Sequence, residues 1–536
     1  MPCSDCKPAF TSLRKLSECK LLSRLRSNQA ATLFEHDELN SLVSHAEKEL
    51  VDYDNTLARL RETIISLENE KKRLNRQVDL AKSLMAPIRK LPPEILRKIF
   101  IAHASTNYIS PKVCNIPGLT IASTCSHWRS IVTRTTALWN NISLRLENGC
   151  QWHPHHVVLV ETLLQLSDKS SLFITIDSPS DVAVIPPFFS LLCDQADRWQ
   201  SLHGSGISTA VLNALSPIQG RLHSLHTFNL IAFFENCRTL VEGAQKVQTL
   251  TVSRMSGIHN AAIPWTQLTR LDVWYSLSSD IVSLLAESVN LQSLKISCYY
   301  PERFDPTSNP EQPVHRHLTL TVLEFFIYDY TMHGHLARSL DLLDLPKLQH
   351  FSVMNISLYP LPESKRLFED GLHWSSKQLP SFLARSSEIT TFSLDNVWVD
   401  TDALIILLQR LPALTSLSLS EPVALPMLND TFLASISGHG HKDGQPLLPR
   451  LTSLILEGYT LSFSMPVFVD VVCSRWKSFS HIEGEIAVIK SVKLKIKSDK
   501  ISPVMVQSLI TLEKRGLDIS IKDQNGDILT ENRIGG

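Results

Sequence analysis

The residues of this chain best suited to chemistry are a few cysteines and histidines of the kinds that bind zinc. Cys3 and Cys6 form a Cys-x-x-Cys pair, and Cys19 follows further along. A structural zinc site needs four ligands, and no second close cysteine pair follows at the spacing of a zinc ribbon or finger. A zinc site that begins at Cys3 stays a hypothesis, and we favour a flexible tail at this position.

Two groups of histidines lack the arrangement of metal ligands. His153, His155 and His156 lie close together, and His439 and His441 alternate with glycines. Neither group has a nearby carboxylate or the helical spacing that would bring the side chains to one metal ion. We interpret both groups as loop or helix-cap residues and predict no metal and no cofactor.

The short motifs that mark common enzyme sites are missing from the sequence. There is no phosphate-binding loop, no glycine fingerprint of dinucleotide binding, no His-Glu-x-x-His and no Gly-x-Ser-x-Gly. An active site built from residues far apart in the sequence would carry none of these motifs, so this alternative stays open. Repeated strands without a glycine-rich catalytic turn nevertheless favour a protein that is not an enzyme.

Composition indicates a protein whose partners are other proteins. With 536 residues, of which 43% are hydrophobic, the chain can bury a large core and is expected to form more than one structural unit. The 52 Lys and Arg residues nearly balance 53 Asp and Glu residues. A net charge of -1 gives no overall field for nucleic acid or for an anionic membrane, so we predict neither as a partner.

The chain is expected to work inside the cell. No apolar run approaches the roughly 20 residues that span a bilayer, and the first residues lack the apolar stretch of a signal peptide. Ten scattered cysteines fit thiols that are kept reduced, so we predict a soluble protein of the cytosol or nucleus without structural disulfides.

A heptad pattern predicts one long helix over residues 38–86, after a flexible tail over residues 1–37. Apolar residues recur at alternating steps of three and four, broken only by Lys71, and Pro87 ends the helix. The two core positions hold Val43, Leu50, Leu57, Ile64 and Val78, and Tyr53, Leu60, Leu67 and Leu74. Two interpretations stay open: a coiled-coil homodimer through residues 39–81, or a helix that packs back onto its own chain.

A small three-helix module is predicted over residues 88–142. Leu91-Pro92-Pro93-Glu94-Ile95-Leu96-Arg97-Lys98-Ile99-Phe100 has the prolines of a helix start and apolar residues at helical spacing. A polar break follows from Ser105 to Gly118, then a second helical stretch from Leu119 to Val132, and Leu138-Trp139 closes the module.

Residues 143–536 repeat a pattern in which two apolar anchors, three residues apart, precede an alternating strand. We count eight such units, which begin at Leu222, Val247, Leu268, Leu291, Leu348, Ile389, Leu414 and Leu451. The first steps, from Leu230 to Val252, Val273 and Ile296, are 22, 21 and 23 residues, within the range of leucine-rich repeats. The pattern predicts a solenoid that lines one concave surface with strands, and an ordinary α/β domain is the alternative.

Lysines alternate with apolar residues between Lys490 and Lys500. This pattern is typical of an edge strand that lysines protect against aggregation. Contact with nucleic acid is the alternative interpretation.

The module over residues 88–142 resembles an F-box. The matching residues are the opening Leu91-Pro92-Pro93, Ile99-Phe100, the segment Cys125-x-x-Trp128-Arg129 and the closing Leu138-Trp139. With the preceding helix and the leucine-rich region, the chain is similar to a large group of fungal F-box-domain proteins of the mushroom-forming lineage. The resemblance is close over about 50 residues and loose over most of the chain.

The resemblance implies a substrate receptor of an SCF-type ubiquitin ligase. Its module would dock to the small adaptor subunit and, through it, to a cullin, while the repeats would bind an unknown target protein. The adaptor-facing residues carried over by position are Leu91, Pro92, Pro93, Ile95, Leu96, Ile99 and Phe100, with Trp128 and Trp139 contributing to that surface or to the module's own core. The implied fold is an α/β multidomain chain with a long helix, an F-box-like module and a leucine-rich-repeat-like solenoid. A coiled-coil leucine-rich-repeat scaffold without a role in ubiquitination is the alternative.

Overall fold

The structure is a computed structural model of the whole chain, and it has an α/β fold with a long N-terminal helix and a parallel β-sheet. It describes residues 18–28, 30–104, 106–178, 184–253, 263–274, 278–298, 314–327, 336, 340–356, 378–422, 426–437, 447–477, 487–499, 501, 506–524 and 526–527. The chain divides into two compact units, Met1–Leu96 and Arg97–Gly536. Within the described residues, no helix is both long enough and apolar enough to span a membrane.

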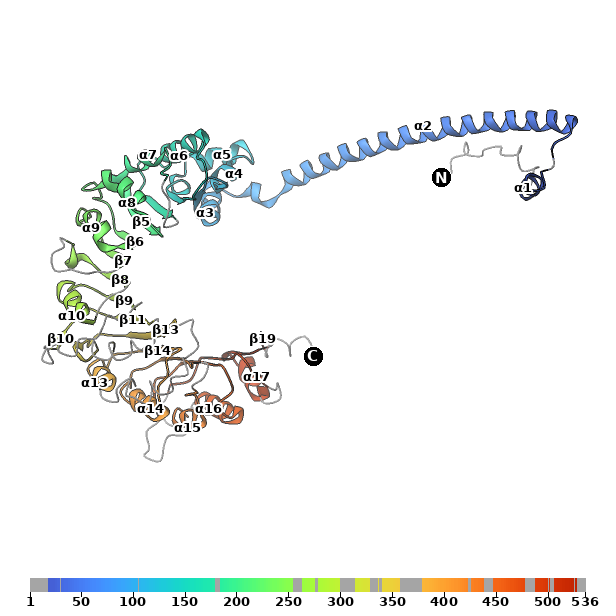
Figure 1. Cartoon of the computed structure of the whole chain (residues 1–536). Helices are drawn as coiled ribbons and strands as arrows, with labels where there is room; N and C mark the ends of the chain where they lie inside the picture. The colour runs from blue at the N-terminus through green and yellow to red at the C-terminus, as the bar shows by residue number, and fades with distance from the viewer. Residues whose placement is uncertain are drawn as a thin grey trace. The chain divides into compact units, whose positions relative to one another are not determined.

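The first unit is dominated by α2 (Leu33–Met85), a single helix of 53 residues (Figure 1). A capping box starts it, because Thr32 and Glu35 satisfy each other's backbone N–H groups. It ends before Pro87, as predicted, with Ala86 in an extended conformation. The short 3-10 helix η2 (Pro87–Lys90) follows.

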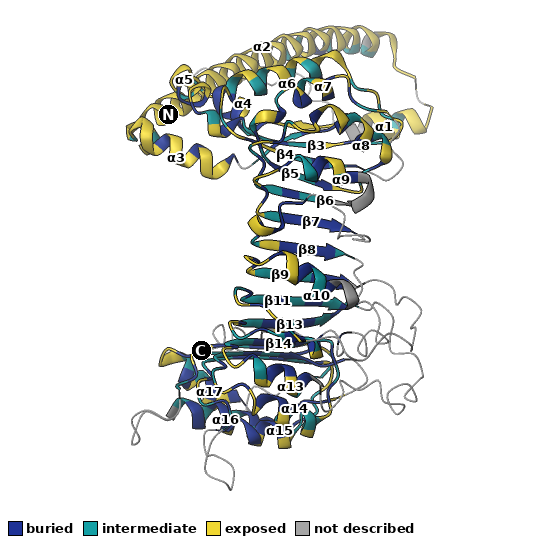
Figure 2. Ribbon diagram, turned by 90° about the vertical axis from the view of Figure 1, so that its left-hand side faces the viewer, coloured by how far each residue is buried: buried dark blue, intermediate teal, exposed yellow. Residues whose placement is uncertain are grey.

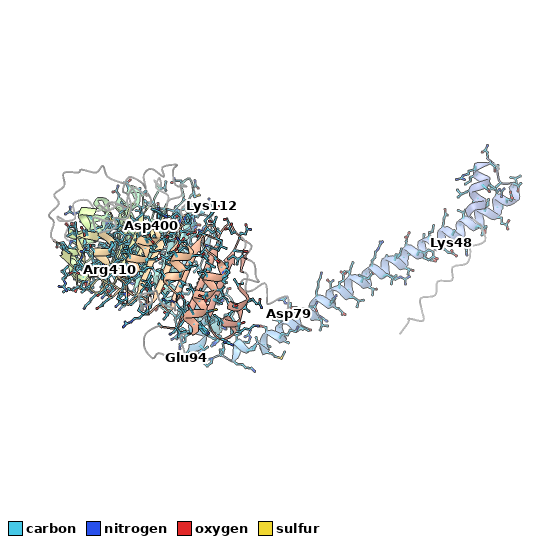
Figure 3. The ribbon with its side chains drawn as sticks, turned by 90° about the horizontal axis from the view of Figure 1, so that it is seen from below. Lys48, Asp79, Glu94, Lys112, Asp400 and Arg410 are labelled. Atoms are coloured by element: carbon cyan, nitrogen blue, oxygen red, sulfur yellow. The ribbon has the colours of Figure 1, made fainter. Side chains whose placement is uncertain are left out.

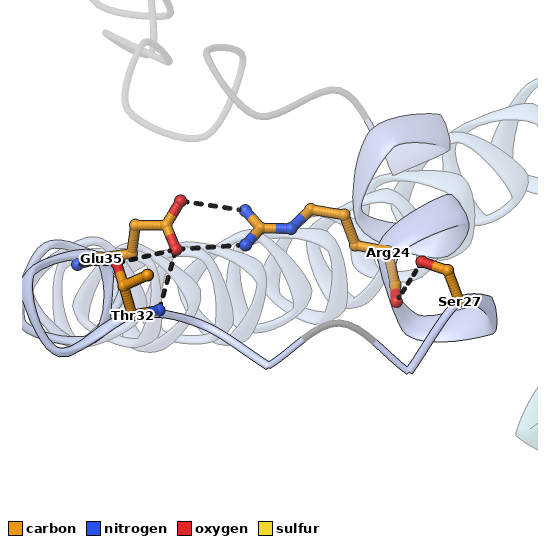
Figure 4. A network of polar contacts seen from close by, with 4 residues as sticks. All are labelled: Arg24, Ser27, Thr32 and Glu35. Atoms are coloured by element: carbon orange, nitrogen blue, oxygen red, sulfur yellow. Dashed lines mark hydrogen bonds and ion pairs between the residues drawn. The ribbon is translucent and has the colours of Figure 1, made fainter.

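The prediction of a flexible tail over residues 1–37 is wrong for the part that the structure describes. Helix α1 (Glu18–Arg26) lies in that region, and α2 begins at Leu33 instead of residue 38. Arg24 of α1 forms an ion pair with Glu35 at 3.2 Å between Nη2 and Oε2 (Figure 4). The Thr32 backbone N–H and the Arg24 guanidinium lower the pKa of Glu35 to about 2. Cys3 and Cys6, the suggested start of a zinc site, lie outside the described residues.

The second unit is built on one sheet in which strands follow one another in chain order. Its parallel strands are β1 (Asn107–Ile109), β3 (Asn141–Arg145), β4 (Leu172–Asp177), β5 (Trp199–Ser205), β6 (Thr227–Phe233), β7 (Thr249–Ser253), β8 (Arg270–Trp274), β9 (Ser293–Cys298), β11 (Val322–Ile327), β13 (His350–Asn355), β14 (Thr391–Asp395), β15 (Ser416–Ser420), β16 (Ser453–Gly458), β17 (Ser491–Ile496) and β18 (Asp518–Asp523). Short antiparallel strands β2 (Cys114–Asn115) and β19 (Gly526–Asp527) pair with β1 and β18 at the two ends of this order. A separate parallel pair joins β10 (His315–Arg316) and β12 (Leu343–Asp344).

Helices cover one side of this sheet (Figure 1). They are α6 (Pro154–Leu166), α7 (Phe189–Cys193), α8 (Thr209–Leu215), α9 (Phe234–Glu242), α10 (Ser278–Glu287), α13 (Gln378–Arg385), α14 (Thr401–Leu408), α15 (Asp430–Ser435), α16 (Met465–Lys477) and α17 (Gln507–Lys514). Short 3-10 helices η4 (Ala196–Arg198), η5 (Ser216–Ile218) and η7 (Trp265–Gln267) complete the connections. We call the other side of the sheet the open face.

Burial alternates along the strands, as expected for a sheet with one covered side. In β14, Phe392 and Leu394 are fully buried, whereas Thr391, Ser393 and Asp395 are half-buried. Figure 2 shows this mixture of buried and intermediate residues on successive strands from β5 to β14. The apolar side chains therefore form the core with the helices, and the polar ones line the open face.

The strands of the large sheet from β7 to β17 start with the same hydrogen-bond arrangement. The carbonyl oxygen of Thr390 accepts bonds from the backbone N–H groups of Thr415 at 2.8 Å and Ser416 at 2.9 Å, and the Thr415 hydroxyl also donates to it at 3.0 Å. The same two-donor pattern recurs at the carbonyl groups of His226, Gln248, Thr269, Gln292, Thr321, Gln349, Thr415 and Thr452. This series of shared acceptors sets the register from β6 to β17.

All eight units counted in the sequence contain a strand, but the sheet also has parallel strands outside them, among them β5, β11 and β18. Strand β11 lies between the fourth and fifth units, with Leu323 and Phe325 buried.

Strand β17 was predicted to be an edge strand, and this prediction is wrong because it pairs with β16 on one side and β18 on the other. Its lysines therefore do not protect a sheet edge.

The module predicted over residues 88–142 contains three helices and also strands of the large sheet. The helices are α3 (Pro93–His103), α4 (Pro117–Ala122) and α5 (Ser126–Thr133), followed by the 3-10 helix η3 (Thr136–Leu138). The second predicted helix is divided in two, because Cys125 caps α5 by accepting a bond from Trp128 N–H through Sγ. The predicted polar break forms β1 and β2, and β1 continues the sheet beside β3.

Gly118 is expected to be essential for the packing of this region. A Cβ atom at this position would lie 2.6 Å from Cη2 of Trp139, whose ring is fully buried and whose indole N–H donates to the Val132 carbonyl at 3.0 Å. We predict that Gly118→Ala lowers the free energy of unfolding by about 1 to 3 kcal/mol through overpacking. Urea unfolding followed by tryptophan fluorescence measures this change.

Leu119→Ala is the control for this prediction, because Leu119 lies on the same helix and its side chain is exposed. We expect it to change the stability by less than about 0.5 kcal/mol. Equal stability of Gly118→Ala and the unaltered chain would contradict the packing described for Trp139.

Candidate protein-docking surfaces

The adaptor-facing residues predicted on α3 and before it divide into exposed and buried groups. Pro92, Pro93, Ile95 and Ile99 are exposed, the two isoleucines by 41% and 42%, and Leu91 is half-buried. Ile95 and Ile99 are four residues apart and lie on the same side of the helix. We call Pro92, Ile95 and Ile99 the α3 face, an apolar surface that is open to a partner.

The other predicted residues serve the interior of the fold. Leu96 and Phe100 are buried, and the Phe100 ring contacts the half-buried Trp128 ring at 4.9 Å between centroids. Trp139 is fully buried. The prediction that Leu96 and Phe100 face an adaptor is therefore not supported by their positions, because a buried side chain cannot bind a partner without opening the fold. Of the two positions expected for Trp139, the burial of its ring agrees with the module's own core.

Sequence reasoning missed three exposed apolar residues near the start of the second unit. Ile101, Val113 and Leu119 are exposed by 41%, 60% and 42%. Helical spacing places Ile101 on a different side of α3 from Ile95 and Ile99. Val113 lies in the segment that was predicted to be polar, so its exposure could not be read from the pattern.

The histidines considered as metal ligands have a local structural role. The backbone N–H of His153 donates to Nδ1 of His156 at 3.1 Å at the start of α6, and His156 is buried. Burial and the neighbouring His155 lower the pKa of His156, which favours its neutral form. Across the described residues, no three His, Cys, Asp or Glu side chains are placed to hold a metal ion. His439 and His441 lie outside these residues.

Charged and aromatic side chains gather on the open face of β8, β9 and β11. Asp272, Lys295 and Glu324 are lateral neighbours in the strand register. Lys295 Nζ lies 3.9 Å from Asp272 Oδ2 and 4.2 Å from the centre of the Phe326 ring. Glu324 Oε1 lies 3.4 Å from His350 Nε2 on β13. We call Asp272, Trp274, Lys295, Ser297, Glu324 and Phe326 the Asp272 cluster.

The Asp272 carboxyl group of this cluster has a pKa close to neutral pH. Burial raises the pKa of Asp272 to about 6, and the negative charge of Glu324 acts in the same direction. Lys295 and the indole of Trp274 oppose the shift without cancelling it. The carboxyl group can therefore be either a hydrogen-bond donor or an acceptor close to physiological pH.

Three buried polar atoms of the Asp272 cluster lack a well-aligned hydrogen bond within the described part of the chain. They are Asp272 Oδ1, Trp274 Nε1 and Ser297 Oγ. The Trp274 indole N–H lies near enough to the Asp272 carboxyl to lower its pKa, and Trp274 is paired with Ser297 across β8 and β9. Leaving buried polar groups unsatisfied costs about 1 to 3 kcal/mol each. A bound partner that supplies their hydrogen bonds would recover this free energy, which makes the Asp272 cluster a candidate binding surface.

The lysines of β17 lie on the same open face, at the other end of the sheet. Lys495 and Lys497 both form ion pairs with Glu457, at 3.1 and 2.8 Å. Lys493 is exposed beside them. Three lysines, two of which share the carboxylate of Glu457, form only a small positive patch, so they give little support to nucleic-acid binding.

Comparison of the sequence with models of known protein families and with curated proteins gave no match. The functional inference therefore depends on the chain's own residues and geometry.

Asp272→Asn is expected to stabilise the fold more at high pH than at low pH. The folded-state pKa of about 6 lies above the ordinary value of 3.8, so the native state favours the protonated acid. The protonated carboxyl group of Asp272 stabilises the native state fully below about pH 4, and this stabilisation is lost as the pH rises through 6. We predict that the gain in the free energy of unfolding, relative to the unaltered chain, grows by up to about 3 kcal/mol from pH 4 to pH 8.

Urea unfolding at the two pH values measures this gain. Asp395→Asn is the matched control, since it removes the same charge from the open face at β14. An equal gain at both pH values for Asp272→Asn would contradict the raised pKa.

Proposed function

We propose that the chain is a non-catalytic substrate receptor of an SCF-type ubiquitin ligase, which acts in the cytosol or nucleus. The α3 face docks to the small adaptor subunit and, through it, to a cullin. The open face of the sheet holds the target protein. The transfer of ubiquitin is carried out by partner subunits.

The observation that supports adaptor docking best is the exposure of Ile95 and Ile99 beside buried Leu96 and Phe100. An amphipathic helix in a folded protein normally hides its large apolar residues. Exposed isoleucines on one side of α3, within a segment that resembles an F-box, indicate a surface that a partner covers.

The second half of the proposal is that the sheet is a leucine-rich-repeat solenoid. The supporting features are the chain order of the strands, the buried anchors and the shared carbonyl acceptor at each strand start. A single strand-plus-helix unit cannot bury its own apolar face, so neighbouring units must stack. Such a solenoid presents its strand residues to a protein partner, and the Asp272 cluster contains buried polar atoms without a well-aligned hydrogen bond.

A coiled-coil leucine-rich-repeat scaffold is the second candidate function. The exposed apolar residues along α2 agree with it, because a coiled coil joins copies of a chain without any ligase subunit. In this alternative, α3 is only a brace between the helix and the repeats. Binding of the purified adaptor separates the two candidates.

The double variant Ile95→Asp/Ile99→Asp is expected to weaken binding of the purified adaptor subunit at least about tenfold, because two charges would be buried in an apolar interface. Isothermal titration calorimetry with the full chain measures the affinity. Phe100→Ala is unsuitable, since Phe100 is buried and its loss would disturb the fold.

Ile101→Asp is the matched control for adaptor binding. Ile101 lies on the same helix, on another side, and its exposed fraction of 41% equals that of Ile95. We expect it to bind as the unaltered chain does. If the unaltered chain does not bind the adaptor, or if Ile101→Asp weakens binding as much as the double variant does, the scaffold function is the better-supported one.

Lys295→Glu is expected to remove the target protein from the set that co-purifies with the tagged chain, while the adaptor stays bound. The change reverses the charge at the centre of the Asp272 cluster. Lys493→Glu makes the same reversal on the open face of β17 and serves as the control. Quantitative mass spectrometry compares the co-purifying proteins, and an unchanged set for Lys295→Glu would refute this location of the target site.

A further inference from the structure

Helix α2 carries a continuous row of exposed apolar side chains. Leu50, Leu57, Leu60, Ile64, Leu67 and Leu74 are exposed by between 48% and 60%. They occupy the two core positions of the heptad pattern. In Figure 3 the side chains of α2, among them those of Lys48 and Asp79, project outward along the helix. The row has the period of a coiled-coil interface.

A helix of this length provides a large surface for association. Its 53 residues span about 80 Å at 1.5 Å per residue. Burial of one leucine side chain contributes about 1.5 to 3 kcal/mol, so several heptads from two copies can offset the entropy lost on association. Exposed to water, these apolar side chains of α2 form the kind of surface that marks an interaction site.

Charge is divided unequally between the two halves of α2. From Leu33 to Ala58 there are seven acidic residues and one lysine, which give a net charge of −6. From Arg59 to Met85 there are seven basic and four acidic residues, which give a net charge of +3. Two parallel copies would place the acidic half of one against the acidic half of the other, where like charges repel. Two antiparallel copies place the acidic half of one against the basic half of the other.

The heptad positions lead to the same orientation. In a parallel pair, Lys71 would face Lys71 of the other copy within the apolar core. An antiparallel pair alternates the two core positions in each layer, so Lys71 faces an apolar or aromatic residue instead. Its aliphatic stem can then pack in the core while its amine reaches water.

We propose that two copies of this chain associate through α2 as an antiparallel coiled coil. The interface is the row of apolar residues between Val43 and Val78, and the opposite charges of the two halves fix its direction. The dimer gives the proposed receptor two target-binding faces, but its existence does not depend on the proposed function.

Multi-angle light scattering on the full chain tests the association. We expect the mass of a dimer for the unaltered chain and of a monomer for Ile64→Asp at the same concentration. Ile65→Asp is the matched control, because Ile65 is equally large, is 58% exposed and lies outside the row. A monomeric mass for the unaltered chain, or dissociation by Ile65→Asp, would overturn the proposal.

Distances between spin labels test the direction. A label on an encoded non-natural residue at Lys48 is expected about 40 Å or more from its copy in the antiparallel dimer, since the two positions lie near opposite ends. A parallel dimer would hold these labels within about 25 Å, the width of two packed labelled helices. A label at Glu62, close to the centre, should give a short distance in either direction and controls for labelling. A short distance at Lys48 would refute the antiparallel orientation.

Discussion

The structure of the second unit depends on how one strand is joined to the next. At each strand start from β7 to β17, two successive N–H groups bond to one carbonyl of the preceding unit. Directly beside this acceptor lies an apolar anchor, such as Leu268 or Leu414, which is fully buried. Because each buried anchor of this size contributes about 1.5 to 3 kcal/mol, the shared acceptor and the anchor together hold every unit in register. The side chains of the open face can then vary without altering the fold.

The sequence predicted the features that repeat. The strands that follow Leu268, Leu291 and Leu414 were expected because two apolar anchors and an alternating strand recur in each, and α2 was expected from its heptads. Strand β11 carries the same anchors, Leu320 and Leu323, but it was missed because the neighbouring apolar residues Leu318, Val322 and Phe326 obscure the alternation. The position of β17 was wrong because an alternating lysine pattern is the same for an edge strand and for an interior strand with one open face.

The candidate site was less predictable, because burial depends on tertiary contacts. The pattern that opens α3 identified Ile95, Leu96, Ile99 and Phe100 as one apolar group, but only the fold separates the two exposed isoleucines from the buried pair. The sequence left Trp139 either at the docking surface or in the core, and its ring fills the space that Gly118 leaves. The Asp272 cluster joins residues from three strands, and no local pattern brings Asp272, Lys295 and Glu324 together.

The central claim is that α3 docks to an adaptor. Hydrogen–deuterium exchange of the full chain, with and without the purified adaptor subunit, tests it most directly. The account predicts slower exchange of the amides of α3 (Pro93–His103) on adaptor binding, while the strands from β5 to β18 exchange as before. Unchanged exchange at α3 in the presence of saturating adaptor would contradict the claim.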